Sequence, residues 1–292
     1  MEVPLCDVVI VNFNAGPFLK ETIATVLASS CVAKIYLVDN ASSDGSVDGL
    51  DFGQQLVLKR NNQNLGFATA ANMGLAQTTA EYILVLNPDC RVMPGAVERL
   101  IDVLESRADA GMAGPLLLNP DGSEQAGGRR KIPTPRLAIS RAFSLTKLSR
   151  FFPDKFDDFL LHQQPLPNDT IETEAISGAC MMVRRAALAE TGPFDEEYFL
   201  HCEDLDWCMR FHQNGWKILF TPQAVVIHEK GVSGRNRQFT VEWHKHAGMI
   251  RFYRKFFSST QSAWMMPIVV SGVWIRFAAI GSYLLITRKR SP

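Results

Sequence analysis

The stretch YILVLNPDC, Tyr82–Cys90, joins a run of apolar residues to a polar turn that carries Asp89. A short apolar run rich in Ile, Leu and Val that ends in a turn is typical of a strand buried on both faces of a sheet. In sheets of parallel strands, ligands bind beyond the carboxyl ends of the strands. We therefore expect a buried strand at residues 82–87 that presents the Asp89 carboxylate at such a binding edge.

Comparable apolar runs alternate with helical patterns through the first part of the chain. Strands are predicted at residues 7–12, 34–39 and 56–59, and helices at about 17–29, 67–77 and 94–107. This alternation predicts an α/β fold with a Rossmann-like, mostly parallel central sheet and helices on both of its faces. Polar residues stand at the carboxyl ends of three of these strands and should share the ligand-binding edge: Asn12, Asn14, Asp39, Asn40, Asn87 and Asp89.

The second half of the chain is less regular. Residues 119–172 are rich in Pro and Gly and read as a long irregular insertion, and a loop of this length inside a compact domain is usually functional. Regular structure is predicted to resume with AISGACMMVRR at 175–185. A helix is predicted at about 202–213, ended by Asn214-Gly215, and a strand at 216–220.

Composition limits the possible functions. The chain has 292 residues, 47% of them hydrophobic, which is enough for one sizeable core. Its 30 basic and 30 acidic residues cancel, which argues against a nucleic-acid-binding protein. The charge is unevenly distributed, because residues 235–292 contain many Lys and Arg and a single acidic residue, Glu242. Such a basic tail predicts an anionic surface as a partner.

The cysteines and the N-terminus indicate a reducing compartment. The six cysteines lie in apolar segments without a CxxC pair, as expected for buried, reduced thiols. The first residues lack the basic start and the cleavage site of a secretory signal.

The C-terminal segment is strongly apolar. Residues 263–286 carry one charged side chain, Arg276, and are followed by Arg288, Lys289 and Arg290. A membrane span needs about 20 apolar residues, so the segment is long enough to cross a bilayer. A central Arg costs roughly 2.5–3.5 kcal/mol on insertion scales. Three interpretations therefore stay open: a full span, an in-plane or re-entrant anchor, and a core helix.

Seven blocks of the sequence, in order and spacing, resemble the inverting nucleotide-sugar glycosyltransferases of family 2. The blocks are VVIVNFN, YLVDNASSDGS, NLGFATAANMGL, YILVLNPDC, ISGACMMVRRAAL, GPFDEEYFLHCEDLDWCMR and GWKILFTPQAVVIHEKGVS. The resemblance covers residues 5–235 and implies the GT-A fold. Within the family the chain looks most like bacterial rhamnosyltransferases of cell-surface polysaccharide synthesis.

The resemblance implies a site for a divalent cation, Mg²⁺ or Mn²⁺, that bridges the donor diphosphate. Asp89 matches the last position of the family's Asp-x-Asp-like motif. The chain departs from that motif at Asn87, where many members have Asp. Only one carboxylate is therefore available to hold the cation. Asn87 could still contribute its carbonyl oxygen or orient a water. His228 matches a histidine that completes the metal site in some relatives, although a lone His beside a strand is more often structural.

The resemblance also implies the catalytic base. Asp204 of HCEDLDW matches the base that takes the proton of the acceptor hydroxyl, and Glu203 is expected to position the acceptor or the base. Both residues fall in the first turn of the predicted helix, where the helix dipole stabilises carboxylates. By that location alone they would be capping residues.

Further residues are implied to hold the nucleotide sugar: Asn12, Asn14, Asp39, Asn64, Gly66, Asn72, Asn87 and Gly178. Asp39 would accept a hydrogen bond from the pyrimidine imide, and the first two Asn residues would line the same pocket. Asn64, Gly66 and Asn72 match the loop and helix start beside the diphosphate and ribose. Gly178 would let the backbone pass under the donor sugar.

The expected activity is transfer of a sugar, best guessed as rhamnose from dTDP-rhamnose, to a hydroxyl of a lipid-linked glycan acceptor. UDP-galactofuranose, UDP-glucose and UDP-N-acetylglucosamine stay open as donors. Two other classes remain: a sugar-phosphate nucleotidyltransferase, whose Gly-rich N-terminal loop this chain lacks, and an inactive glycan-binding membrane protein.

The predicted organisation is a GT-A domain at residues 1–235 and a basic, apolar helical tail at 236–292. The tail would hold the protein at a membrane surface, on the cytoplasmic face of the bacterial inner membrane, peripherally or by a single C-terminal anchor. A homo-oligomer is possible.

Overall fold

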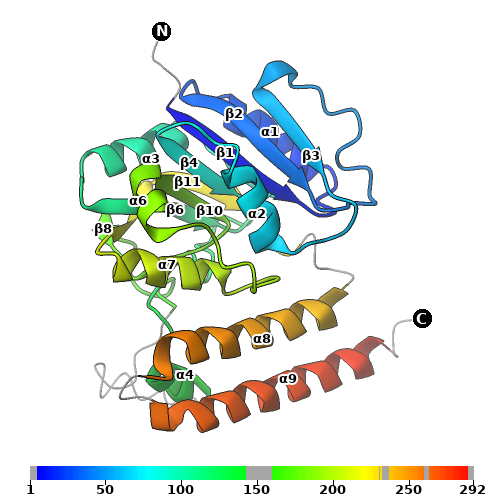
Figure 1. Ribbon diagram of the computed structural model, residues 1–292, viewed down its shortest axis with the longest axis vertical. Helices are drawn as coiled ribbons and strands as arrows, with labels where there is room; N and C mark the ends of the chain where they lie inside the picture. Colours follow the sequence, from blue (N-terminus) through cyan, green and yellow to red (C-terminus); the bar gives the residue numbers. More distant parts are fainter. Residues whose placement is uncertain (1–4, 143–159, 230, 232–236, 260–262, 289–292) are drawn as a thin grey trace.

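The computed structural model describes residues 5–142, 160–229, 231, 237–259 and 263–288. An α/β body forms the upper part of the molecule, and two long helices, α8 and α9, lie across its base (Figure 1). The predicted boundary between domain and tail, at residues 235–236, falls outside the described residues.

The first half of the chain builds the parallel part of the sheet. In chain order it contains β1 (Cys6–Asn12), α1 (Phe18–Leu27), β2 (Val32–Asp39), β3 (Leu56–Arg60), α2 (Phe67–Leu75), β4 (Tyr82–Leu86), β5 (Cys90–Val92) and α3 (Ala96–Glu105). Strand β1 pairs in parallel with β2 and β4, and β2 pairs in parallel with β3. The predicted strands and helices of this half are all present, with ends that differ by a few residues.

The second half completes the sheet with strands of both directions. It contains β6 (Ala110–Leu118), β7 (Arg129–Arg130), α4 (Pro135–Ala142), β8 (Ile171–Glu172), β9 (Ala175–Ile176), β10 (Cys180–Arg184), α6 (Arg185–Thr191), α7 (Glu203–Gln213) and β11 (Lys217–His228). The strand order is β3-β2-β1-β4-β10-β6-β11-β5, with β8 also on β11. Strand β10 is antiparallel to both of its neighbours, whereas β11 is parallel to β6.

The sheet is buried on both faces, as its apolar runs predict. Along β4, Leu84 and Leu86 join a core shared with α1 and α3, whereas Ile83 and Val85 join a core shared with α2, α6 and α7. The fold is therefore the predicted α/β architecture, with a central sheet between two layers of helices.

Two predictions for the second half need correction. The segment 119–172 is not wholly irregular, because β7, β8 and α4 lie within it; residues 143–159 lie outside the described residues. The strand predicted at 216–220 continues to His228, because an irregularity in its pairing with β6 accommodates Pro222.

Strand β6 is not among the predicted strands, since Gly111, Gly114 and Pro115 interrupt its pattern. The glycines are required by packing. A Cβ atom on Gly111 would lie 2.7 Å from the Cβ of Ala187, and one on Gly114 would lie 2.8 Å from Ile176. The residues that weaken the strand signal thus make room for neighbouring elements.

The tail forms a helical pair. Helix α8 (Gln238–Phe257) contacts α7, and α9 (Met266–Arg288) packs along α8 and touches α4 (Figure 1). Salt bridges tie α8 to the body, where Lys255 binds Asp195 at 2.7 Å and the fully buried Asp206 at 2.6 Å.

Candidate active site

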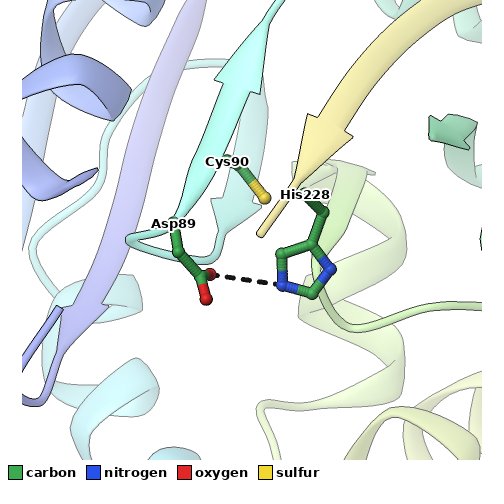
Figure 2. A group of neighbouring side chains, drawn as sticks. All are labelled: Asp89, Cys90 and His228. Atoms are coloured by element: carbon green, nitrogen blue, oxygen red, sulfur yellow. Dashed lines mark ion pairs between the residues drawn. The ribbon is translucent and has the colours of Figure 1, made fainter. Parts of the chain in front are cut away.

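Strand pairing brings Asp89 and His228 together. Asp89 lies between β4 and β5, His228 is the last residue of β11, and β11 pairs with β5 so that His228 faces Cys90. Figure 2 shows the carboxylate and the imidazole facing one another, with Asp89 Oδ1 3.2 Å from His228 Nε2. Both side chains are less than a tenth exposed.

The surroundings of this pair fit a divalent cation. Asp89 Oδ1 is buried and accepts no hydrogen bond from the described residues. A buried carboxylate oxygen without a donor is costly unless a cation neutralises it. The amide Nδ2 of Asn87 lies 3.3 Å from His228 Nε2, so Asn87 borders the pair without adding a second charge. Carboxylate oxygen and imidazole nitrogen are suitable ligands for Mn²⁺, and carboxylate oxygen for Mg²⁺.

Cys90 borders the same site. The side-chain atoms of Asp89, Cys90 and His228 that could bind a metal lie within 4.8 Å of one another. Burial, followed by the charge of Asp89, raises the pKa of the Cys90 thiol well above its usual value. Mg²⁺ and Mn²⁺ prefer oxygen ligands to sulfur, so the candidate ligands are the two residues expected from the sequence.

Asp204 occupies the first turn of α7 and faces the loop that precedes β10. Its Oδ2 accepts a hydrogen bond from the backbone N–H of Gly178 at 3.0 Å, and its Oδ1 accepts one from the N–H of Leu205 at 2.8 Å. A Cβ atom on residue 178 would lie 3.1 Å from the Cβ of Asp204, so glycine is needed for this approach. The side chain of Asp204 stays 15% exposed, which leaves it accessible to a substrate.

The turn that aims Asp204 is strained. His201 and Cys202 both adopt left-handed backbone conformations, with φ of 68° and 71°, which residues with a Cβ atom rarely do. Helix α8 supports this turn, because Gly248 lies so close to His201 that an added Cβ would be 2.7 Å from its carbonyl oxygen. Strain of this kind is typical of functional sites.

Glu203 differs from its neighbour. It is 7% exposed, and one of its carboxyl oxygens has no hydrogen-bond partner among the described residues. Burial, with a further contribution from the charge of Asp204, raises the pKa of Glu203 to about 8. At neutral pH, Glu203 is therefore mostly a neutral acid beside the carboxylate of Asp204.

The structure adds Arg130 to this cluster, a residue that the sequence analysis does not single out. Its guanidinium, from β7, forms an ion pair with Asp204 Oδ2 and donates a hydrogen bond to the carbonyl of Ile176 at 3.3 Å. Arg130 and Asp204 are 74 residues apart in the sequence, and the only local signal is the basic run around Arg130.

One short turn links the two acidic sites. Gly178 N–H binds Asp204, and the carbonyl of the next residue, Ala179, accepts a hydrogen bond from the N–H of Asn87 at 2.9 Å. The base candidate and the cation candidate therefore flank the same backbone segment, which is the segment expected under the donor sugar.

The residues expected around the base of the nucleotide meet at Ser42. Asn12 donates a hydrogen bond to Asp39 Oδ1 at 2.8 Å and one to Ser42 Oγ at 2.9 Å. The backbone N–H of Asn14 binds the same hydroxyl at 3.0 Å. The side-chain carbonyl oxygen of Asn12 is buried without a partner among the described residues, so the group keeps an unused acceptor.

Asn40 organises the neighbouring loop. Its amide donates hydrogen bonds to Asn64 Oδ1 and to the carbonyl of Gly66, both at 3.0 Å. At Gly66, where φ is 86°, an added Cβ would lie 2.6 Å from the carbonyl oxygen of Phe199. Glycine is thus required at position 66 because the segment that leads to α7 lies against it. Asn64 and Gly66 both lie beside Asn40, at the end of β2.

Asn72 is engaged elsewhere. Its amide donates hydrogen bonds to the carbonyl of Phe194 and to Glu196, and it accepts one from the N–H of Phe194, each at 2.9 Å. The structure therefore gives it a role in holding the 194–196 segment to α2. Its expected place beside the ribose and diphosphate stays a prediction.

Comparison with known proteins identifies the family. The profile described as Glycosyl transferase family 2 matches residues 7–192, and the profile described as Glycosyl transferase family group 2 matches residues 145–288. This chain belongs to glycosyl transferase family 2. The chain is therefore a glycosyltransferase, and the nucleotidyltransferase and inactive-protein alternatives lose their support.

Several relatives carry informative names. The chain is 30% identical over 271 residues to N-acetylglucosaminyl-diphospho-decaprenol L-rhamnosyltransferase of Mycobacterium tuberculosis, covering 88% of this chain and 85% of the relative. It is 27% identical over 177 residues to Rhamnosyltransferase WbbL of Escherichia coli, covering 56% of this chain and 58% of the relative.

Solved structures of glycosyltransferases share the fold. GalNAc-T7 with UDP, GalNAc and Mn²⁺ superimposes with a TM-score of 0.63 at 17% identity, covering 88% of this chain and 49% of that one. The mannosyltransferase PcManGT of Pyrobaculum calidifontis with GDP-Man and Mn²⁺ superimposes with a TM-score of 0.60 at 14% identity, covering 99% of this chain and 81% of that one. At these identities the likeness concerns the fold alone.

Proposed function

We propose that this glycosyltransferase moves rhamnose from dTDP-rhamnose to a hydroxyl of a lipid-linked glycan acceptor, with inversion at the anomeric carbon. The single observation that carries the activity is the arrangement of Asp204 and the Asp89–His228 pair on either side of the 177–179 turn. The sugar and the acceptor are proposed from the name of the Mycobacterium tuberculosis relative, which spans most of this chain.

In the proposed reaction, Asp204 is the general base. Its Oδ2 already accepts hydrogen bonds from Gly178 and Arg130, whereas Oδ1 accepts one from Leu205, so Oδ1 is the oxygen with a lone pair left for a proton. As the acceptor hydroxyl loses its proton to Asp204, its oxygen forms the new bond to the anomeric carbon. The bond from that carbon to the diphosphate breaks, and dTDP leaves with the electron pair.

The departing diphosphate needs positive charge, because negative charge develops on it near buried groups. Asp89 and His228 would hold a divalent cation there, Mg²⁺ or Mn²⁺, which stabilises the leaving group electrostatically when bound. Asn12, Asn14 and Asp39 would hold the base of the nucleotide, and Asn64 and Gly66 would border the diphosphate. Gly178, between the two acidic sites, would lie under the sugar.

We also propose that the protein works at a membrane surface, with α9 lying in the plane of the bilayer. The helix at 263–287 is long and apolar enough to cross a membrane, yet in this structure it packs along α8. One side of it, with Val269 and Val273, is buried, and another side, with Ile268 and Ile275, is 48% and 70% exposed. This arrangement supports a lipid-linked acceptor and a location at the cytoplasmic face of the inner membrane.

The test is a transfer assay with the purified protein, Mn²⁺, N-acetylglucosaminyl-diphospho-lipid as acceptor, and a panel of dTDP- and UDP-sugars. Transfer from dTDP-rhamnose alone is expected.

Asp204→Asn should lower kcat by about 10²–10⁴-fold, since general base catalysis contributes that much, while dTDP-rhamnose binding survives. Asp102→Asn, a change of the same kind at an exposed position of α3, is the matched control. Full activity of Asp204→Asn would overturn the role of the base, and transfer from a UDP-sugar instead would overturn the donor.

A further inference from the structure

The second ring nitrogen of His228 has a buried partner that the proposed reaction leaves without a role. Gln125, in the segment that follows β6, is 4% exposed, and its Oε1 lies 2.7 Å from His228 Nδ1. Backbone hydrogen bonds fix the segment, because Gln125 N–H donates to the carbonyl of Leu117 at 2.8 Å. The contact spans 103 residues of sequence.

The orientation of the Gln125 amide follows from its other neighbours. Its Nε2 lies 3.2 Å from the backbone carbonyl oxygen of His228 and 3.0 Å from Asn119 Oδ1. A backbone carbonyl can only accept a hydrogen bond, so the NH₂ group must be on that side. The amide oxygen must then face the ring.

The protonation of the ring follows in turn. An amide oxygen only accepts, so the contact at 2.7 Å requires a proton on His228 Nδ1. In a neutral imidazole the lone pair is then on Nε2, on the side of Asp89. This agrees with Asn87, whose amide Nδ2 lies 3.3 Å from Nε2 and can only donate a hydrogen bond, so that Nε2 is the acceptor in this contact.

We propose that Gln125 is a positioning residue that fixes the Nδ1–H tautomer of His228 and so keeps the lone pair on Nε2, where it can bind the divalent cation. The inference deepens the proposed function, since it assumes that the cation binds between Asp89 and His228. Without Gln125, a proton on Nε2 could donate to the buried carboxylate of Asp89. That tautomer would satisfy both groups and close the site to a metal.

Two substitutions of Gln125 separate this role from a purely structural one. Gln125→Met keeps the length of the side chain and removes its hydrogen bonds. Gln125→Glu also loses the two donated bonds, to Asn119 and to the His228 carbonyl, but keeps an acceptor at Nδ1. Carboxylates are common partners of metal-binding histidines, so this variant should restore the effect. Gln77→Met, on an exposed glutamine after α2, is the matched control.

The first measurement is metal-independent. Nitrogen-15 NMR of histidine rings, above neutral pH in the metal-free protein, reports which ring nitrogen carries the proton, and the His228 signal is identified by its loss in His228→Gln. We expect Nδ1–H in the wild type and in Gln125→Glu, and a shift towards Nε2–H in Gln125→Met. An Nε2–H tautomer in the wild type would overturn the inference.

The second measurement is Mn²⁺ affinity by electron paramagnetic resonance. Loss of an outer partner of a metal ligand typically costs about 10–100-fold in affinity, which is the weakening expected for Gln125→Met. Gln125→Glu and the control should stay within a few-fold of the wild type. Equal losses in Gln125→Met and Gln125→Glu would show that the donated bonds matter and would refute the proposal. If the wild type binds no Mn²⁺, both the cation site of the proposed function and the role of Gln125 in metal binding would be overturned. The NMR measurement would still decide which tautomer Gln125 fixes.

Discussion

At the scale of single residues, the start of α7 holds two adjacent carboxyl groups with different surroundings. Asp204 accepts hydrogen bonds from two backbone N–H groups and forms an ion pair with Arg130, whereas Glu203 is buried with an oxygen that has no partner among the described residues. Environment, not residue type, therefore divides the roles: Asp204 is held by an arginine and backbone donors, and the buried Glu203 keeps its proton.

The raised pKa of Glu203 makes the stability of the protein depend on pH. Its pKa is about 8 in the folded protein against 4.5 for an ordinary Glu, so the folded state binds the proton more tightly than the unfolded state. That stabilisation is complete below about pH 4.5 and is lost as the pH rises through 8. Each unit of pKa shift corresponds to about 1.4 kcal/mol, so the total loss is of the order of a few kcal/mol.

Glu203→Gln, which cannot ionise, should escape this loss. Thermal unfolding of the variant and the wild type should give similar melting temperatures below about pH 4.5, and at pH 9 the variant should be the more stable. Asp102→Asn, at an exposed acid, controls for a general effect of charge. A difference between variant and wild type that does not change with pH would contradict the raised pKa.

Arg130 has a separate prediction. Because its guanidinium holds Asp204 Oδ2, Arg130→Ala should leave the carboxylate free to rotate and lower kcat by roughly tenfold or more, as misplacement of catalytic groups does. The KM for the donor should change little, since Arg130 acts on the base and not on the nucleotide pocket. Steady-state kinetics are the measurement, with Arg136→Ala on the exposed side of α4 as the control. An unchanged kcat would show that Gly178 and Leu205 suffice to hold the base.

At the scale of elements, α8 connects the catalytic edge to the tail. It supports the strained turn before Asp204 through Gly248, and it binds the buried Asp206 through Lys255. Near its N-terminus, Arg237 lies over the ring of Phe13, 5.3 Å from its centre, beside the residues expected to bind the nucleotide. The helix thus carries α9 in a fixed relation to the site.

Helix α9 presents an apolar face to the outside. The residues Ile268, Ile275 and Ile286 recur at helical spacing on one side and are 48–70% exposed. Arg276 is exposed beside this face, where its long side chain can reach the headgroup layer, so it is less costly than in a full span. The geometry suits a helix lying in the membrane surface.

A charge on this face should weaken membrane binding. Ile275→Glu is expected to reduce binding to vesicles containing anionic phospholipid by about tenfold or more, which corresponds to at least about 1.4 kcal/mol. Leu58→Glu, which places the same charge on a partly exposed residue of the edge strand β3, should have no effect. Vesicle co-sedimentation measures both. Alkaline carbonate should extract a surface-bound protein, so resistance to extraction would contradict the in-plane arrangement.

At the scale of the whole molecule, the candidate metal pair joins elements made by distant parts of the chain. Asp89 follows β4 of the first half, and His228 ends β11 of the second half. Strands β10 and β6 lie between β4 and β11 in the sheet. A bound cation would therefore connect the two halves of the sheet at the catalytic edge.

Binding of Mn²⁺ should consequently stabilise the fold. A ligand at one hundred times its Kd stabilises the state that binds it by about 2.7 kcal/mol, which should raise the melting temperature measured by thermal unfolding, and EDTA should reverse the effect. His228→Gln should show little of this increase. An equal increase in that variant would place the cation elsewhere.

Much of this molecule could be predicted from the sequence because the relevant signals are local. The apolar runs define β1, β2 and β4 and their burial on both faces, and the polar residues directly after them are brought to one edge by the parallel pairing alone. The position of Asp89 at this edge could be predicted in this way, whereas the roles of Asp204 and Gly178 were implied by the resemblance to the family. The six cysteines are buried and free, as their apolar surroundings indicate.

What only the tertiary structure decided depends on contacts between residues far apart in the chain. The partner of Asp204 is Arg130, 74 residues away, and the partner of His228 Nδ1 is Gln125, 103 residues away. Packing against distant residues likewise decides three further features. These are the protonation of Glu203, the formation of β6 despite its glycines, and the side of α9 that faces outward. A local pattern records the preference of a segment, whereas charge, tautomer and exposure are set by neighbours that folding alone brings near.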